Sequence, residues 1–428
     1  MTSPVAPAAF LCTATHSVMQ DPVLAICGHL FDRAITQKEL VCPIDHKTLS
    51  GIRVIPFSEL KVEIEKWKAK LQKSDPLEGN FSKMAISQVR NVLTIPRLKN
   101  VHNAHFDDIH GLIRLSDDRF VSGSKDTTLK IWSKDGDLIQ TLEMGREKGY
   151  EHWITALSVF PDGCWSSGTR QGALTIWDQE GKALSTVTLD SKKSSQQGPI
   201  CKARNQVRIN CVAPMDAANG KVYVGMPQYV EVWNMQTNQL VAQYPASVND
   251  WVYCIEVLEN QHLLVVIGSV LEYWQMNSSE VEHKETLIQG TAKSPEGQRP
   301  HISAIKRLEY NPAIVGTALF DGSVRLLDLQ SKTIVRVFQE HQKRVWAIEN
   351  IAPQIFASCA DDATIKLWDV RQPKSIVTIG GNPGRVSSVM RLNSNTLVSG
   401  SCPDDVFRSK DKALLSFWDI RSLKKGGC

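Results

Sequence analysis

The 428-residue chain lacks several features that would assign it quickly to a class of protein. Its ten cysteines run from Cys12 to Cys428 without a Cys-x-x-Cys pair, which argues against a disulfide scaffold and a complete structural zinc site. It has no run of about twenty apolar residues, so no transmembrane helix is expected. The start, MTSPVAPAAFLC, lacks the basic residues of a secretory signal. The net charge is only +4, which does not call for nucleic acid or an anionic membrane as a partner.

What the chain does contain is a repeat. Seven segments of alternating apolar and turn-forming residues each reach a bulky apolar anchor. The anchors are Trp132, Trp177, Trp233, Trp274, Leu327, Trp368 and Trp418, spaced 45, 56, 41, 53, 41 and 50 residues apart. A period of this length, with four short strands and a terminal Trp-Asp, predicts a β-propeller. Stacking blades around an axis buries both faces of each sheet, so seven anchors predict seven blades and a mainly β fold.

The region from about residue 89 to 421 resembles the WD-repeat family. The resemblance is strongest in the first and sixth blades, where a His, a turn Asp and a Trp recur at one spacing: His105, Asp126 and Trp132, then His341, Asp362 and Trp368. In the family these residues form a buried hydrogen-bond network with Ser or Thr, which implies a structural role and not a catalytic one. His152 also fits the second blade, and His301 with Asp321 fits the fifth. The third and fourth blades lack both residue types.

The last blade needs an outer strand from elsewhere, because the chain ends soon after the seventh anchor. We expect Val89–Leu98 (VRNVLTIPRL) to supply it and so close the ring. Insertions are expected at about 188–206, 284–300 and 402–412. The first contains Lys192, Lys193, Lys202 and Arg204 and is followed by Arg208. It is either a solvated loop or a contact for an acidic partner.

Residues 8–72 do not share the repeat and are expected to form a small α+β domain, followed by a linker at 73–88. A helix is predicted over 58–72, because Leu60, Ile64, Trp67 and Leu71 form one apolar stripe. Upstream, Cys12, Cys27, His29 and Cys42 suggest a zinc-binding RING. The positions of their expected near partners include Thr15 and Asp45, so two complete tetrahedral sites cannot be built. One improvised site from the four remaining residues is the alternative.

The same residues, in the same order, closely resemble the U-box, the zinc-free relative of the RING. The matching positions are Cys12, Thr15, Met19 to Val23, Gly28 to Arg33, Cys42, Pro43, Leu49, Pro56, Leu60, Lys61, Ile64 and Trp67. In that family hydrogen bonds and salt bridges stabilise the loops that zinc would hold. Asp21, His29, Asp32, Arg33 and Asp45 are available for this role. The resemblance therefore implies neither metal nor cofactor.

The U-box resemblance also implies a ubiquitin-protein ligase. Such a module has no covalent nucleophile. It docks a ubiquitin-conjugating enzyme that carries ubiquitin as a thioester, and it accelerates transfer by positioning. The docking contacts carry over to Ala14, Leu40, Pro43, Ile44 and His46. Ala14 stands where the family has Ile, so we expect docking to be weaker by about 1–3 kcal/mol if this position is a hot spot. His46 stands where many active members have Arg.

The propeller would then bind the substrate protein on one face. Two alternatives stay open: a non-catalytic WD-repeat scaffold with a degenerate U-box, and a substrate receptor of a cullin-type ligase. The second rests on Trp368-Asp369-Val370-Arg371 and Trp418-Asp419-Ile420-Arg421, which resemble the Trp-Asp-x-Arg motif of such receptors. A homodimer through Trp67 and Leu71 also stays open, as U-boxes often dimerise. The expected location is intracellular and cytoplasmic, and the nucleus and delivery into a host cell by a bacterium stay open as alternatives.

Overall fold

A computed structural model of the chain describes residues 95–144, 152–189, 208–216, 220–258, 262–277, 280–289, 301–404, 412–421 and 423. It also gives the backbone of three short N-terminal strands, β1 (Pro22–Leu24), β2 (Leu30–Asp32) and β3 (Ile55–Pro56). These strands form one antiparallel sheet in the order β2-β1-β3. The helix predicted over 58–72 and the linker at 73–88 lie outside the described residues.

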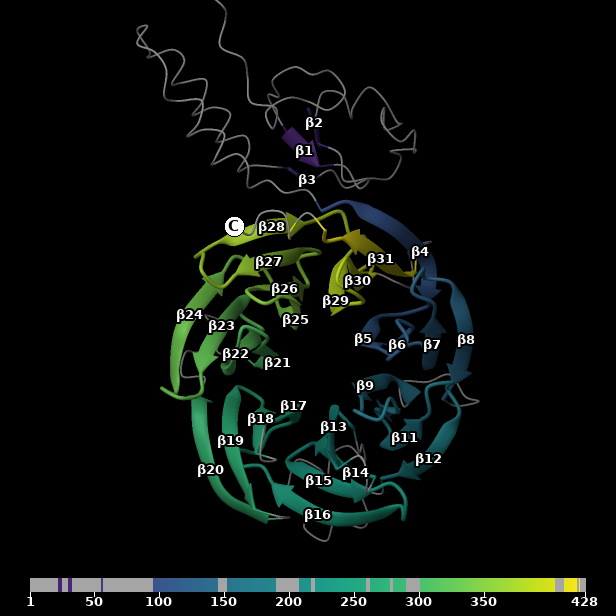
Figure 1. Ribbon diagram of the computed structural model, residues 1–428, viewed down its shortest axis with the longest axis vertical. Coiled ribbons are helices and arrows are strands. Elements are labelled where there is room, and N and C mark those ends of the chain that lie inside the picture. The colour runs from purple at the N-terminus through teal and green to yellow at the C-terminus, as the bar shows by residue number, and fades with distance from the viewer. Residues whose placement is uncertain are drawn as a thin grey trace, which may run out of the picture.

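Seven four-stranded antiparallel sheets form a ring around a central opening (Figure 1). Blade one contains β5 (Ile109–Arg114), β6 (Phe120–Ser124), β7 (Thr128–Trp132) and β8 (Leu138–Glu143). Blade two contains β9 (Ile154–Val159), β10 (Trp165–Thr169), β11 (Ala173–Trp177) and β12 (Ala183–Thr188). Blade three contains β13 (Cys211–Asp216), β14 (Lys221–Met226), β15 (Tyr229–Asn234) and β16 (Gln239–Pro245). Blade four contains β17 (Val252–Val257), β18 (Leu263–Ile267), β19 (Val270–Asn277) and β20 (Glu280–Gln289).

The last three blades complete the ring. Blade five contains β21 (Ile302–Leu308), β22 (Asn311–Leu319), β23 (Ser323–Asp328) and β24 (Thr333–Gln339). Blade six contains β25 (Val345–Ala352), β26 (Ile355–Ala360), β27 (Ile365–Asp369) and β28 (Ser375–Ile379). Blade seven contains β29 (Arg385–Arg391), β30 (Thr396–Cys402), β31 (Ala413–Asp419) and β4 (Arg97–His105). The prediction of a mainly β, seven-bladed propeller is confirmed. In the described part of the chain, no helix has the length and apolar character needed to cross a membrane.

The burial of each strand depends on its position in the blade. In blade one the second strand, FVSGS, is buried along its whole length between neighbouring blades, whereas the outer strand, LIQTLE, is almost wholly exposed. The seven anchors all lie at or near the end of a third strand and are all buried. Gly123 on β6 and Gly168 on β10 let the blades approach closely. A Cβ added at these positions would come within 2.7 Å of Ile154 and 2.5 Å of Ile209 on the following blade.

The ring is closed by β4, which pairs with β31 (Figure 1). The register joins Ala413 to His105 and Trp418 to Arg97. The expected closing run, 89–98, overlaps this strand only at its first two residues, so its predicted position was wrong. The physical reason is His105, whose ring reaches blade one and thereby fixes the residues before it as the outer strand of blade seven.

The predicted insertions differ in outcome. Residues 284–289 belong to β20 and pair with β19, so the insertion expected at 284–300 begins too early. The insertion expected at 188–206 follows the end of β12, and residues 190–207 lie outside the described residues. The insertion expected at 402–412 lies between β30 and β31, where residues 405–411 are not described.

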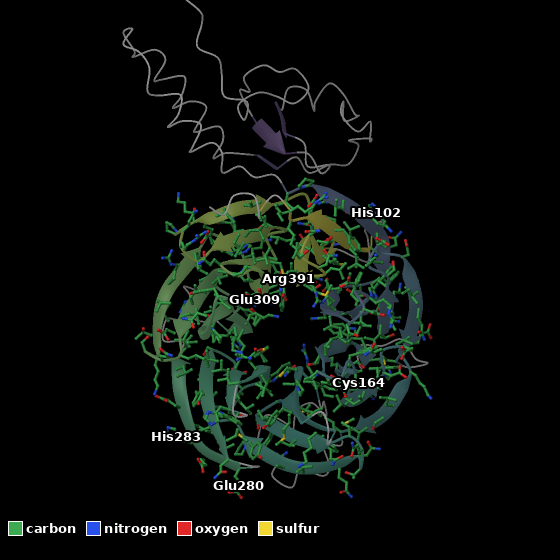
Figure 2. The ribbon with its side chains drawn as sticks, in the orientation of Figure 1. His102, Cys164, Glu280, His283, Glu309 and Arg391 are labelled. Carbon is green, nitrogen blue, oxygen red and sulfur yellow. The ribbon has the colours of Figure 1, made fainter. Side chains whose placement is uncertain are left out.

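An ion pair ties three blades together near the central opening. Arg391 of blade seven donates from Nη2 to Glu309 Oε1 of blade five at 2.5 Å, and from Nη1 to the Ile351 carbonyl of blade six at 3.0 Å. Figure 2 shows Glu309 and Arg391 side by side at this position. One guanidinium therefore spans the two interfaces that flank blade six.

Candidate functional site

The predicted contacts for a conjugating enzyme lie outside the described residues. They are Ala14, Leu40, Pro43, Ile44 and His46. The same holds for Asp21, His29, Arg33 and Asp45, and for the side chain of Asp32, whose backbone belongs to β2. Trp67, Leu71, Lys192, Lys193, Lys202 and Arg204 are also not described. These assignments stay predictions.

The first blade contains a buried polar network. His105 Nε2 lies 2.6 Å from Ser122 Oγ, and His105 Nδ1 lies 2.9 Å from Asp126 Oδ2. Trp132 donates from Nε1 to the same Ser122 oxygen at 2.7 Å. Thr128 donates to Asp126 Oδ1 at 2.6 Å. Burial lowers the pKa of His105, and the hydrogen bonds outweigh burial to hold the pKa of Asp126 well below its usual range.

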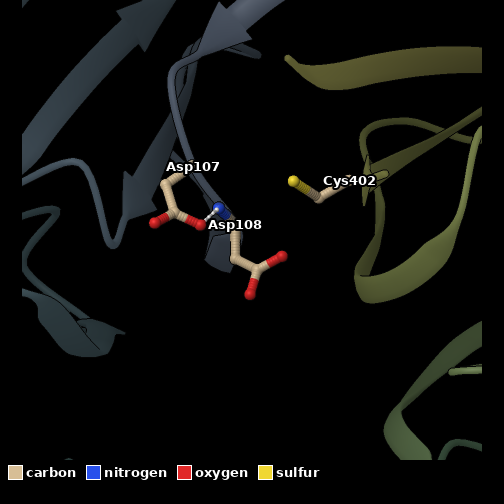
Figure 3. Close-up of side chains that lie close together, drawn as sticks. All are labelled: Asp107, Asp108 and Cys402. Atoms are coloured by element: carbon tan, nitrogen blue, oxygen red, sulfur yellow. Dashed lines mark hydrogen bonds between the residues drawn. The ribbon is translucent and has the colours of Figure 1, made fainter. Parts of the chain in front are cut away.

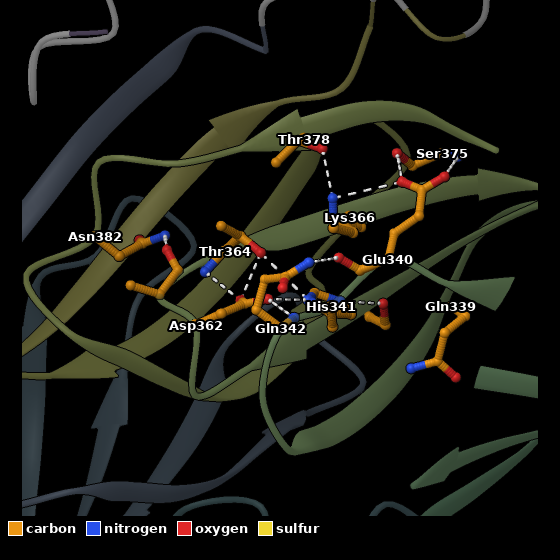
Figure 4. Close-up of polar contacts among 12 residues, drawn as sticks. Gln339, Glu340, His341, Gln342, Asp362, Thr364, Lys366, Ser375, Thr378 and Asn382 are labelled. Carbon is orange, nitrogen blue, oxygen red and sulfur yellow. Dashed lines mark hydrogen bonds and ion pairs between the residues drawn. The ribbon is translucent and has the colours of Figure 1, made fainter. Parts of the chain in front are cut away.

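The sixth blade repeats this arrangement, as Figure 4 shows. His341 Nδ1 lies 2.8 Å from Asp362 Oδ2, and His341 Nε2 lies 2.8 Å from Ser358 Oγ. Trp368 donates to Ser358 Oγ at 2.8 Å. Burial acts to raise the pKa of Asp362, but hydrogen bonds from His341 and Thr364 lower it to about 2. In both networks the His, Asp, Ser, Thr and Trp side chains are bonded to one another, which fits a structural role.

The assignment of His301 and His152 to equivalent networks does not hold. His105 and His341 lie four residues before the buried Ile109 and Val345 that start their inner strands. His301 lies only one residue before the equivalent Ile302. Its ring stacks on Phe320 at 5.6 Å between ring centres, and Nδ1 has no partner among the described residues.

Asp321 and His152 also do not belong to a network of the kind seen in blades one and six. Asp321 accepts from Ser323 Oγ at 2.6 Å and from Arg325 Nη2 at 2.9 Å, within its own turn. His152 lies two residues before Ile154, which is again the wrong spacing. In blade two Trp177 still donates to Ser167 Oγ at 2.9 Å.

Blades three and four replace the network with a buried glutamate. Trp233 donates from Nε1 to Glu231 Oε2 at 2.7 Å, and Trp274 donates to Glu272 Oε2 at 2.8 Å. Each glutamate lies two residues before its tryptophan on the same strand. Both carboxylates accept a second bond, from Gln243 and Ser247 respectively. The sequence signal was a Glu-x-Trp triplet, which the prediction overlooked.

One face of the ring carries seven equivalent residues, one from each blade. In five blades the inner strand starts at a buried Ile or Val that pairs with the end of the second strand and is followed by a register shift. The equivalent residue is Ile209, two residues before β13, in blade three, and Val386, the second residue of β29, in blade seven. The residue before this Ile or Val lies at the mouth of the central opening. These rim positions are Asp108, Trp153, Arg208, Trp251, His301, Arg344 and Arg385. Arg and Trp are the residue types enriched in the energetic centres of protein interfaces.

A cavity of about 340 Å³ lies at this mouth, on the side of blades one, six and seven. It is lined by Asp108, His110, Lys125, Arg344, Trp346, Asp361, Arg385 and Ser387. All of these residues lie at the start of an inner strand or just after a second strand. Because neighbouring strands run antiparallel, both places belong to the same face of the ring.

The floor of the cavity is held by ion pairs. Asp108 accepts from Lys125 Nζ at 2.6 Å and from Arg385 Nε at 2.7 Å. Burial raises the pKa of Asp108, but these two cations outweigh it and hold the pKa below its usual value. Burial, followed by the charges of Lys125, Arg208 and Arg385, lowers the pKa of His110 to about 3. His110 is therefore neutral at pH 7, and the local field is positive.

Three arginines of this face are stacked on aromatic rings. The Arg344 guanidinium lies 4.2 Å from the ring centre of Phe320, and that of Arg208 lies 5.1 Å from Trp251. Arg170, in the turn after β10, lies 5.0 Å from Trp153, which also faces Lys125 at 5.0 Å. Stacking restrains each guanidinium before any ligand arrives.

Asp107, Asp108 and Cys402 form a group whose geometry suggests a metal site (Figure 3). Their chemistry does not fit one. Asp108 already neutralises Lys125 and Arg385. Burial and the nearby Asp108 carboxylate strongly raise the pKa of the Cys402 thiol, which therefore stays protonated, whereas a metal ligand must be a thiolate.

The two Trp-Asp-x-Arg motifs lie on the opposite face, where the third strands end. Arg371 donates from Nε to Asp369 Oδ1 at 2.9 Å and from Nη2 to Oδ2 at 2.6 Å. Arg421 contacts Asp419 in the same way, with Nε to Oδ1 at 2.9 Å. Both arginine side chains are more than half exposed, at 59% and 65%. The outer edge of each guanidinium is therefore open to a partner.

Family models match two parts of this chain. The model described as U-box domain matches residues 6–73, and the model described as WD domain, G-beta repeat, matches residues 97–133 and 332–369. The crystal structure of the WD40 beta propeller domain of Doa1 has a TM-score of 0.56 and 16% sequence identity. It aligns with 78% of this chain and 99% of that chain, which shows the fold alone.

Curated relatives match shorter stretches. Protein SPA1-RELATED 3 of Arabidopsis thaliana is 36% identical over 19% of this chain and 10% of its own length. E3 ubiquitin-protein ligase COP1 of the same plant is 24% identical over 19% of this chain and 12% of its own length. DDB1- and CUL4-associated factor 10 of Homo sapiens is 28% identical over 29% of this chain and 22% of its own length. The chain thus spans a quarter or less of each of these three relatives.

Proposed function

We propose that this chain, a U-box segment joined to a seven-bladed WD-repeat propeller, is a ubiquitin-protein ligase. The single observation that carries the proposal is the U-box match over residues 6–73 in the same chain as a closed ring with an arginine-rich and tryptophan-rich face. The similarity to a plant E3 ubiquitin-protein ligase supports it. The U-box recruits the ubiquitin-loaded conjugating enzyme, and the propeller holds the substrate protein.

In the proposed reaction a lysine amine of the substrate attacks the thioester carbonyl between ubiquitin and the conjugating enzyme. An isopeptide bond forms as the carbon–sulfur bond breaks, the sulfur of the conjugating enzyme leaves as a thiolate, and the proton that the amine nitrogen loses passes to solvent. The ligase contributes no covalent intermediate and only positions the reactants. Pro43 and Ile44 are proposed to contact the conjugating enzyme, together with Ala14, Leu40 and His46. The five cysteines of the described residues are all unpaired, which supports an intracellular, reducing setting.

The test is autoubiquitination by the full chain with a panel of conjugating enzymes. Ubiquitin chains should form with at least one enzyme, and Pro43→Ala should reduce them without changing the urea midpoint of the ring. Absence of chains with every enzyme, in an assay where a known U-box ligase works, would refute the proposal. It would then favour a non-catalytic scaffold.

A second candidate is a substrate receptor of a cullin-type ligase. It is favoured by the exposed arginine pair, Arg371 and Arg421, and by the similarity to DDB1- and CUL4-associated factor 10. Co-purification of a cullin adaptor with the full chain, lost on Arg371→Ala, would support this reading. Equal recovery of the adaptor with both proteins would contradict it.

A further inference from the structure

We propose that the rim positions bind an acidic segment of the substrate protein, with anionic side chains bound at Arg208 and at Arg344 on the mouth of the ring. This inference rests on the proposed function, because it names the chemistry of the substrate that the propeller would select. The anion is a carboxylate of Asp or Glu, or a phosphate on Ser or Thr. Both offer at least two negatively charged oxygens at a spacing that accepts paired hydrogen bonds from a guanidinium.

The first support is an excess of positive charge on this face. Lys125, Arg344 and Arg385 line the cavity, while only Asp108 and Asp361 oppose them there. Asp108 is shared by two cations, and Asp361 lies 3.8 Å from Arg344 while it accepts from Trp346 Nε1 at 2.6 Å. The mouth therefore carries more cations than its own carboxylates neutralise.

The second support is Arg208, which has no anionic partner among the described residues. Its side chain is partly buried, and this burial, together with the like charge of the neighbouring Arg170, lowers the pKa of Arg208. A buried and uncompensated guanidinium is costly to the free protein. An anion from a ligand would remove that cost, so the site favours a negatively charged occupant.

The third support is a group of buried polar atoms without partners in the described part of the chain. Arg208 Nε, both amide atoms of Asn210 and His301 Nδ1 belong to it. Arg208 and His301 occupy rim positions, and Asn210 follows two residues after one. Buried polar atoms in native proteins are nearly always hydrogen-bonded, so these groups are available to the polar atoms of a ligand.

The placement of the charges and the size of the cavity favour a peptide over a nucleic acid as the ligand. Arg170 and Arg208 lie on blades two and three, whereas Arg344 lies on blade six, and Asp108 and Asp361 at the cavity would repel a continuous phosphate backbone. A nucleic-acid surface is instead a stripe or patch of cations. A cavity of about 340 Å³ has the size to take one or two side chains of a peptide.

The experiment uses the labelled full chain on an array of short peptides made in matched sets. Each set differs only at one position, which holds Glu, phosphoserine or Gln. We expect the Glu or the phosphoserine member to bind, the Gln member to bind at least about tenfold less, and binding to weaken as salt is raised. The member that binds better identifies the source of the anion. Equal binding of all three members would overturn the inference.

Two variants test the residues. Arg208→Met and Arg344→Gln should each weaken binding of the selected peptide at least about tenfold. Arg208→Met should change the urea midpoint little, because the native side chain has no anionic partner to lose and gives up only its stacking on Trp251. Arg119→Gln is the matched control, since Arg119 pairs with Asp117 in a turn on the opposite face and should leave binding unchanged. Loss of binding in the control, or a fall in the urea midpoint of Arg208→Met as large as that of Asp362→Asn, would contradict the assignment.

Failure of this inference can be told from failure of the proposed function. Autoubiquitination by the unmodified chain is measured in parallel with the array. Chain formation without preference for an acidic peptide would refute only the rim assignment. Preference for an acidic peptide without chain formation would refute only the ligase. Displacement of the peptide by a duplex oligonucleotide at lower concentration would show that the rim serves nucleic acid and would overturn the inference.

Discussion

The carboxylate of Asp362 should stabilise the ring much more than the carboxylate of Asp321, although the two residues lie in equivalent turns of neighbouring blades. Asp362 is about 10% exposed and accepts from His341, Gln342 N and Thr364, which contributes both its N–H and its hydroxyl. Asp321 is exposed, and among the described residues its carboxylate accepts hydrogen bonds only from the nearby Ser323 and Arg325. The substitutions Asp362→Asn and Asp321→Asn compare the two directly.

The expected magnitude follows from the pKa of Asp362. Its fall from 3.8 to about 2 corresponds to about 2–3 kcal/mol of stability at neutral pH. Loss of hydrogen bonds to a buried charged acceptor gives a similar figure. Asp362→Asn should therefore lower the free energy of unfolding by about 2–3 kcal/mol, and Asp321→Asn by less than about 1 kcal/mol.

The pH dependence gives an independent check. Because the folded pKa of Asp362 lies below the unfolded value, its stabilisation is complete above pH 5 and is lost as the pH falls through 4 toward 2. The difference between the native chain and Asp362→Asn should shrink by about 1 kcal/mol between pH 7 and pH 3. Urea unfolding followed by tryptophan fluorescence measures both. Equal losses in the two variants, or a difference that does not change with pH, would refute the reasoning.

Three further predictions concern other parts of the ring. Glu272→Gln should lower the free energy of unfolding by about 1–3 kcal/mol, because the amide nitrogen would face donors such as Trp274 Nε1. A smaller change in urea midpoint for this variant than for the exposed control Glu280→Gln would contradict the prediction. Arg391→Ala should speed amide hydrogen exchange in the strands of blades five to seven that it joins, and unchanged exchange would show that the ion pair is not a restraint. Removal of metal ions with a chelator should leave the melting temperature unchanged, because Asp108 is already paired with cations, and a rise on adding Zn²⁺ or Ca²⁺ would argue for a metal site.

The sequence predicted the ring because its strongest signal is repeated. A buried tryptophan or leucine at the end of each third strand recurs at a spacing that only a propeller explains. The closing strand was harder to place, because RLKNVHNAH is polar and lies on the outside of the last blade. VRNVLTIPRL is more apolar and was therefore predicted to be the closing strand. What fixes the strand is the distant contact of His105 with Ser122, which no local pattern reveals.

The polar networks show the same limit. A histidine near a blade start is informative only at the right distance from the buried residue of the inner strand, which is why His301 was misassigned. Blade five also lacks the rest of the network, since Leu327 replaces the tryptophan and Thr317 donates to the Arg325 carbonyl. His301 therefore turns onto Phe320 instead. In blades three and four the same need of tryptophan for an acceptor is met by Glu231 and Glu272.

The rim positions could have been found from the sequence by aligning the blades on the buried Ile or Val instead of on the tryptophan. Aligned in this way, the preceding residue varies among aspartate, tryptophan, histidine and arginine, while the Ile or Val stays apolar. In each blade, two neighbouring positions thus have different roles. The apolar position packs the ring, and the position before it lies at the mouth and is free to take any chemistry.

This separation has an energetic consequence. Substitutions in the buried networks remove hydrogen bonds that nothing else can replace, so they should act on the stability of the whole ring. A substitution such as Arg208→Met removes a charge that the fold itself does not compensate, so it should change binding with little loss of stability. The ligand preference of a seven-bladed ring can therefore change by substitution of one rim residue at a time. The position of each rim residue is set by the buried Ile or Val that follows it. Selectivity for an acidic substrate then depends on which blades carry arginine, and not on any alteration of the fold.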